Sequence, residues 1–173
     1  SCVPDDDPSD WFRDLFDFVE DGDDYSLLAH EAFRRDVFSD IKKNSTIKSD
    51  FIHDINLFRK RDFWKNRKMD IKKVSKISRD GKKETLFQAR TVKCSRGHGR
   101  ILFSFIDDEP DAKHDIIVFF ACQLTRKNTE DQRNWIKRTT KKKFPDLDEN
   151  QWVTVEKEPV PDSKSVDDFT IED

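Results

Sequence analysis

The sequence predicts an α+β domain in which a small antiparallel sheet packs against helices. Two apolar, β-branched and aromatic runs, 101–106 (ILFSFI) and 116–122 (IIVFFAC), are short for helices and are separated by a polar segment. A third strand-like stretch, 85–92 (TLFQARTV), precedes them, with Gly97 and Gly99 supplying a turn. We therefore expect a three-strand meander, joined by a further strand near the amino terminus.

Length and composition limit what this sheet can belong to. The chain has 173 residues, of which 40% are charged and 34% hydrophobic, so the core should be compact and rich in phenylalanine. No apolar run approaches the roughly 18 residues of a membrane span, and no secretory signal is recognised at the amino terminus. Cys2, Cys94 and Cys122 have no CxxC spacing. We expect neither a zinc site nor a disulfide framework, and a reducing, cytoplasmic location.

Charge is distributed unevenly along the chain. The net charge is -3, yet residues 25–145 contain 30 Lys and Arg against 16 Asp and Glu, a balance of +14. Residues 1–24 and 146–173 contain ten acidic residues each. We expect a basic domain between an acidic amino-terminal extension and an acidic carboxy-terminal tail. The basic block is typical of a polyanion binder, and the acidic ends either compete for its surface or only keep it soluble.

The amino-terminal half is expected to be mainly helical. Residues 10–20 have apolar side chains at helical spacing, which predicts a short amphipathic helix that packs on the main domain or, alternatively, docks a partner. Residues 25–33 indicate a strand followed by a turn, and 34–43 a helix. A second helix is expected over 49–66, with its first residue, Ser49, as the cap.

The carboxy-terminal half holds the meander and one more helix. Between the second helix and the meander the chain is strongly basic, and Asp80 and Gly81 mark the turn into the first meander strand. After the last strand, Thr129 fits a capping box, so a helix is expected from there to about Lys143, with Trp135 as an apolar anchor. Cations at the end of a helix are favourable in themselves, so part of this charge requires no ligand.

Three short motifs and the order of the elements resemble a known family. The motifs are LFQARTV at 86–92, GRILFSF at 99–105 and IIVFFACQLTRKNTED at 116–131. With them, residues 25–143 resemble the RelE/ParE superfamily of bacterial toxins, and within it the HigB-type messenger-RNA interferases of plasmids, chromosomes and prophages. The resemblance implies a RelE-like fold, here with an extra amino-terminal helix and an acidic carboxy-terminal extension.

The resemblance implies a toxin of a type II toxin–antitoxin system that inhibits translation by cutting messenger RNA, on the ribosome, without a metal or other cofactor. The 2′-hydroxyl attacks the adjacent phosphodiester, so the protein must neutralise charge on the phosphate and move two protons. Arg90 and Arg100 fall on the family's two arginine positions, and an arginine fork meets two phosphate oxygens. His98 is the candidate general acid or base. The candidate RNA-binding residues are Lys93, Arg96, Arg126, Lys127, Arg133 and Lys137.

Alternatives remain for the site and for the function. The two arginines can instead pair with carboxylates on an exposed sheet, and His98 can be a solvated turn residue. The chain also departs from the family at 123–125 (QLT), where a histidine, an aromatic residue and paired lysines often begin a basic turn. The rival classes are a non-catalytic nucleic-acid-binding regulator, for instance phage-encoded, and a ParE-like toxin that inhibits DNA gyrase.

The toxin interpretation also implies protein partners. A cognate antitoxin is expected, and the acidic ends contribute to its interface or fold over the basic core. No membrane partner is expected. A metal-dependent enzyme is the least favoured of the functional classes, because the four histidines do not have the spacing of metal ligands with the cysteines or with one another.

Overall fold

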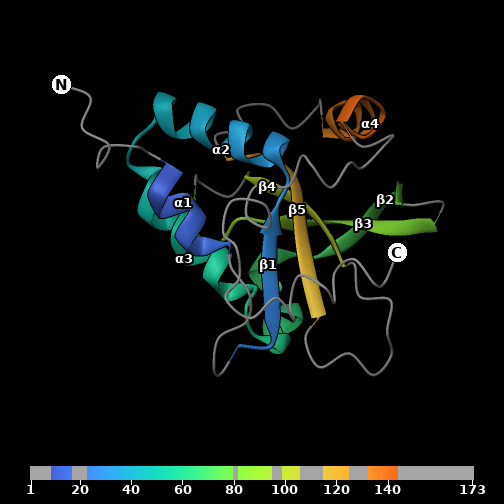
Figure 1. Ribbon diagram of the computed structural model, residues 1–173, viewed down its shortest axis with the longest axis horizontal. Coiled ribbons are helices and arrows are strands. Elements are labelled where there is room, and N and C mark those ends of the chain that lie inside the picture. The colour runs from blue at the N-terminus through green and yellow to red at the C-terminus, as the bar shows by residue number, and fades with distance from the viewer. Residues whose placement is uncertain are drawn as a thin grey trace, which may run out of the picture.

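A mixed five-stranded sheet lies at the centre of the protein (Figure 1). The computed structural model describes residues 9–16, 23–79, 82–94, 99–105, 115–124 and 132–143, in the strand order β1-β5-β4-β3-β2. Neighbours from β2 to β5 are antiparallel, whereas β1 is parallel to β5. The expected α+β class is confirmed, but the sheet is not purely antiparallel. The strands are β1 (Tyr25–Ala29), β2 (Lys72–Arg79), β3 (Lys82–Arg90), β4 (Arg100–Phe105) and β5 (Asp115–Gln123).

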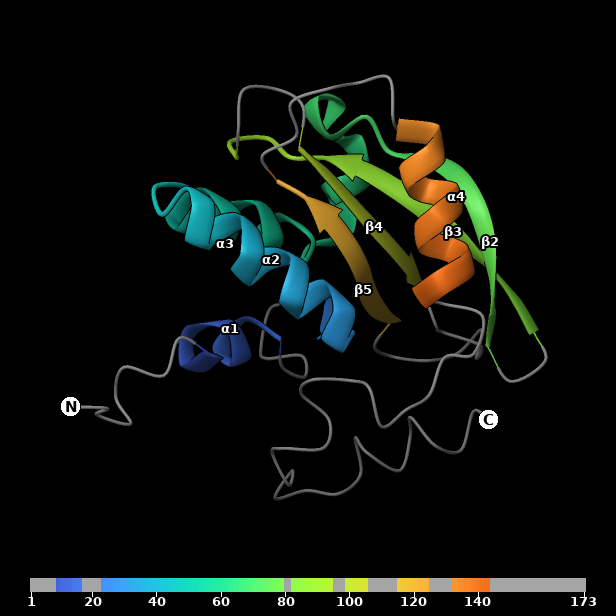
Figure 2. The same cartoon turned by 90° about the horizontal axis from the view of Figure 1, so that it is seen from above.

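Helices cover both faces of this sheet (Figure 2). Helices α1, α2 and α3 pack on one face, and α4 lies on the other. Two short 3-10 helices, η2 and η3, connect α3 to β2. The bounds are α1 (Ser9–Leu15), α2 (Glu31–Lys43), α3 (Ile47–Leu57), η2 (Arg61–Lys65), η3 (Arg67–Met69) and α4 (Gln132–Lys143).

The meander has four strands rather than the expected three, because the basic stretch before it contains β2. This strand occupies the sheet edge and carries exposed lysines at positions 72, 73 and 76, with Val74 and Ile77 turned toward the α4 side. Lysines on an edge strand discourage pairing with other chains, and they also weaken the apolar alternation that marks a strand. The predicted Asp80–Gly81 turn, which lies outside the described residues, therefore joins β2 to β3.

Two predicted helices differ from the observed ones. Helix α1 ends at Leu15 within the described residues, and α3 runs from Ile47 to Leu57 instead of over 49–66. The cap of α3 is Thr46 and not Ser49, since Asn44 turns the chain by accepting from the Thr46 amide (3.2 Å) and hydroxyl (2.6 Å). The helix stops where Phe58 and Phe63 both enter the core, which a straight helix would not permit.

The larger core lies between the sheet and helices α1 to α3. Phe12 and Phe16 of the α1 segment are buried in it, so this helix packs on the main domain, the first of the two alternatives. Phe119 of β5 lies at its centre, with the ring centroids of Phe16, Phe33 and Phe58 5.0–5.6 Å from its own. A smaller core on the opposite face is formed by Leu28, Leu86, Leu102, Val118 and Phe120 with Trp135 and Ile136 of α4.

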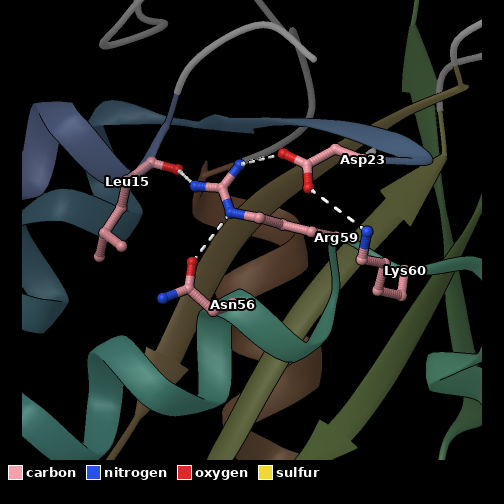
Figure 3. A network of polar contacts seen from close by, with 5 residues as sticks. All are labelled: Leu15, Asp23, Asn56, Arg59 and Lys60. Atoms are coloured by element: carbon pink, nitrogen blue, oxygen red, sulfur yellow. Dashed lines mark hydrogen bonds and ion pairs between the residues drawn. The ribbon is translucent and has the colours of Figure 1, made fainter. Parts of the chain in front are cut away.

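Arg59 ties α1 and α3 to the start of β1 (Figure 3). Its Nε donates to Asn56 Oδ1 (2.8 Å), an Nη donates to the Leu15 carbonyl at the end of α1, and the other Nη lies 3.7 Å from Asp23. Lys60 adds a second cation 3.9 Å from the same carboxylate. The network satisfies a helix-terminal carbonyl that has no partner within its own helix.

Two further properties follow from the described residues. Cys94 and Cys122 are buried and do not form a disulfide with one another, whereas Cys2 lies outside the described residues. None of the helices in the described part of the chain has the length and apolar character needed to cross a lipid bilayer.

Candidate nucleic-acid interface

The two predicted arginines meet at one end of the sheet, where β3 and β5 end and β4 begins. The strand register sets Arg90 directly opposite Arg100, and Arg100 directly opposite Gln123. Directly opposite residues project from the same face of a sheet, with Cβ atoms about 5 Å apart. Because Leu102, two residues after Arg100, packs in the smaller core, this face is the one that α4 covers.

The environments of the two arginines differ. The Arg90 side chain is 45% exposed, and its Nε lies 3.8 Å from Asp70. Arg100 is only 3% exposed, and its guanidinium donates to the carbonyl of Gly99 (3.3 Å). Arg90 is therefore accessible to a ligand from solvent, while Arg100 lies beneath the surface next to it. Two cations at opposed ladder positions repel one another, so an anion at Arg90 would be favoured there.

Helix α4 starts close to this pair. Its first residue, Gln132, donates a side-chain hydrogen bond to buried Gln88 on β3 (2.8 Å). Arg133 and Lys137 are exposed and one turn apart, a rise of about 6 Å along the helix. Since Trp135 is buried against the sheet, the two predicted RNA-binding residues lie on the outer surface of α4.

Asp54 of α3 holds the chain as it leaves β3. The fully buried carboxylate accepts the backbone amides of Lys93 and Cys94, with each N–O distance 3.2 Å. Burial raises the pKa of Asp54, and the two amides act in the opposite direction. The thiol of Cys94 has its pKa raised as well, first by burial and then by the Asp54 charge. The backbone at Lys93 is thus fixed, while the Lys93 side chain is exposed.

Two aspartates of α2 hold the end of β5 in the same way. Asp36 accepts from the amide of Cys122 (3.2 Å) and Asp40 from the amide of Leu124 (2.8 Å). Burial raises the pKa of Asp40, the Leu124 amide lowers it, and the Asp36 charge raises it further. Carboxylates on two helices therefore fix both points at which the basic segments leave the sheet. The predicted residues on those segments, Arg96, His98, Arg126 and Lys127, lie outside the described residues.

Gly99 is required by a close backbone approach before β4. The amide of Thr91 donates to the Gly99 carbonyl (3.1 Å), and the Thr91 hydroxyl donates to the Cys94 carbonyl (2.7 Å). A Cβ at position 99 would lie 2.4 Å from Thr91 Oγ1. Only glycine fits beside this buried side chain, which explains the glycine in the predicted turn.

Two features of this surface have no counterpart among the sequence-based expectations. Asp70 reaches Arg90 because β2 pairs with β3, and it takes a left-handed conformation (φ 45°) that aspartate tolerates better than most residues. The polar pair Gln88 and Gln132 joins β3 to α4. Neither feature has a local sequence signal, since each depends on residues brought together by the sheet.

No group of three or more His, Cys, Asp or Glu within the described ranges is arranged to hold a metal ion. Comparison with protein-family models, with curated proteins and with solved structures gives no significant match to this chain.

Proposed function

We propose that this protein is a metal-independent endoribonuclease of the RelE/HigB kind, the toxin of a type II toxin–antitoxin pair that inhibits translation. The observation that carries the proposal is the juxtaposition of Arg90 and Arg100 on opposed strands, one accessible and one buried. Such a pair suits a phosphodiester whose negative charge increases during cleavage.

In this mechanism the exposed guanidinium of Arg90 contacts the scissile phosphate. Its fork holds two non-bridging oxygens and remains charged throughout. The 2′-hydroxyl of the substrate loses its proton and attacks the phosphorus, and the bond from phosphorus to the 5′-oxygen breaks. The upstream fragment then ends in a 2′,3′-cyclic phosphate, and the 5′-oxygen takes up a proton to leave the downstream fragment with a 5′-hydroxyl. Arg100, buried beside it, strengthens the positive potential at that phosphate. Lys93 and the outer cations of α4 guide the RNA backbone. His98 is the proposed general acid or base that transfers a proton.

The fold is compatible with this proposal in its order of elements. A strand, two helices, the antiparallel meander and a basic helix follow one another as the resemblance implies, with β2 and α1 as additions. A messenger RNA, the ribosome and a cognate antitoxin are the proposed partners. The acidic ends of the chain are proposed to contact the basic core or the antitoxin.

One observation favours a second function, that of a nucleic-acid-binding regulator without catalysis. Because Arg100 is 3% exposed, a ligand contacts Arg90 without contacting Arg100 unless side chains rearrange. A binding protein needs no such rearrangement. The two functions differ in whether RNA is cut.

The test uses messenger RNA with and without ribosomes, in the presence of EDTA, with the cleaved ends mapped. The variants are Arg90→Ala, Arg90→Lys and Arg100→Ala, with Arg35→Ala on α2 as a matched exposed-arginine control. We expect cuts with cyclic phosphate ends, a loss of about 10²–10³ in rate for Arg90→Ala, as for removal of one charge-stabilising donor, and no change for Arg35→Ala. Arg90→Lys should recover binding but not the rate, because lysine lacks the fork.

A folded wild type that binds RNA but never cuts it would refute the nuclease and favour the regulator. Inhibition of DNA supercoiling by gyrase, without RNA cleavage, would instead support the ParE-like alternative.

A further inference from the structure

Trp64 of η2 is the one large apolar side chain that is exposed among the described residues, at 40%. Its ring is nevertheless held firmly. It stacks on Phe105 (5.3 Å between centroids, 23° between planes) and meets Phe87 edge-on (5.3 Å). Phe63, next to it in the chain, lies 5.0 Å away. The result is an indole fixed in one orientation with part of its surface open to solvent.

A single exposed aromatic residue is common on protein surfaces and by itself indicates nothing. What distinguishes Trp64 is the charge around it. In η2 and η3 four exposed cations accompany it against a single carboxylate, Asp62. Those cations are Arg61, Lys65, Arg67 and Lys68.

The neighbouring edge strand adds two more cations on the same side. Lys73 is directly opposite Phe87, and Lys76 directly opposite Thr85, so both project from the sheet face that carries the Trp64 contacts. Both are exposed, and neither takes part in an ion pair within the described part of the chain. Trp64 therefore belongs to the basic η2–η3 segment and faces the side of the sheet from which Lys73 and Lys76 of the β2 edge project.

We propose that Trp64 with Lys73 and Lys76 is a binding site for single-stranded nucleic acid, in which an unpaired base stacks on the indole and the lysines contact the flanking phosphates. An immobilised aromatic ring beside a row of cations is the arrangement by which proteins bind single strands without reading their sequence. A ring already fixed by phenylalanines loses little conformational freedom on binding. An apolar protein partner would instead have to remove water from the six cations around Trp64 without offering them a counter-charge, which is unfavourable.

This site is separate from the arginine pair and does not depend on catalysis there. The Trp64 contacts belong to the sheet face that carries α1 to α3, whereas Arg90 and Arg100 project from the α4 face. A strand bound at Trp64 is therefore held at the β2 edge, on the other side of the sheet. The two proposals can be tested and can fail independently.

The experiment titrates full-length protein with a fluorescent 2′-O-methyl oligouridylate of 15 nucleotides, which cannot be cleaved by attack of a 2′-hydroxyl. Parallel titrations use oligodeoxythymidylate and an abasic sugar-phosphate strand of equal length. The variants are Trp64→Ala, Trp64→Phe and the double variant Lys73→Gln, Lys76→Gln. Lys42→Gln with Lys43→Gln, at the exposed end of α2, is the matched charge control.

We expect Trp64→Ala to weaken binding of both base-bearing strands about 5- to 150-fold and to leave the abasic strand unchanged, because only a base can stack. Trp64→Phe should retain most of the affinity. The double lysine variant should reduce the slope of log affinity against log salt by about 1.4, two phosphate contacts of a single strand, and the control should not. If Trp64→Ala loses equal affinity for the 2′-O-methyl RNA and the DNA strand, the site binds any single strand. If it loses affinity for the 2′-O-methyl RNA alone, the site is specific for RNA.

The proposal is overturned if Trp64→Ala binds as the wild type does, or if it weakens the abasic strand equally. It is also overturned if the wild type binds none of the strands at low salt, which would leave Trp64 as a contact for protein. Circular dichroism and thermal unfolding show whether Trp64→Ala is folded. If it is not, the binding of the Trp64→Phe variant and of the double lysine variant tests the site instead. Arg90→Ala should retain Trp64-dependent binding even where it abolishes cleavage.

Discussion

Replacing Asp54 by asparagine tests how the end of β3, which carries Arg90, is held in place. The buried carboxylate accepts two backbone amides through three N–O contacts of 3.2 Å. Asparagine keeps the shape and one acceptor oxygen, but it turns an NH₂ group toward a backbone donor. One lost hydrogen bond and one unsatisfied buried donor cost about 1–3 kcal/mol. At low pH, where the carboxyl is neutral in the wild type, the variant should be less stable by roughly this amount.

The difference between the two proteins should depend on pH. Burial raises the folded-state pKa of Asp54 above its unfolded value, which is about 3.9. Its contribution to stability is therefore full below about pH 4 and is lost as the pH rises through the folded-state pKa. Each such group changes the free energy of unfolding by at most about 1.4 kcal/mol per pH unit. The variant lacks this pH dependence. The difference in free energy of unfolding between wild type and variant should therefore become smaller from pH 4 to pH 7.

The assay is urea unfolding followed by circular dichroism at pH 4, 5, 6 and 7. The carboxyl of Asp40, whose pKa is also raised, is present in both proteins and cancels in the comparison. Asp50→Asn, one turn earlier on α3, is the matched control, because no hydrogen bond joins Asp50 to the segment after β3 within the described residues. The role assigned to Asp54 would be refuted if the difference in free energy of unfolding between wild type and Asp54→Asn stays constant or grows with pH. It would also be refuted if Asp50→Asn shows the same difference.

Three further substitutions test other parts of the structure. Gly99→Ala should lower the midpoint of thermal unfolding, because its Cβ would lie 2.4 Å from buried Thr91 Oγ1; an unchanged midpoint would contradict this packing. Asp70→Asn, which keeps the left-handed backbone accessible, should strengthen RNA binding at low salt and lose that advantage at high salt, since it frees Arg90 from a competing anion. Equal affinities at low salt would argue against competition. Phe119→Ala should cost about 3–5 kcal/mol in urea unfolding, and a loss below about 1 kcal/mol would disprove its central place in the core.

Much of the fold was predictable because its signals are local. The β-branched and aromatic runs of β4 and β5 and the helical spacing of α2 report their own conformation over a few residues. Prediction failed for β2, whose lysines protect an exposed edge, and for the end of α3, where the burial of Phe58 and Phe63 turns the chain. In both places tertiary context overrode the local pattern.

The sequence by itself determined the α+β class, the separation of charge into a basic centre with acidic ends, and the choice of Arg90 and Arg100 as residues of interest. Only the tertiary structure decided that β1 runs parallel to β5, that one arginine is exposed and the other buried, and that Asp70 lies beside Arg90. Exposure and pairing depend on strand register between segments far apart in the chain. No local pattern contains that information, because it arises only when the whole sheet assembles.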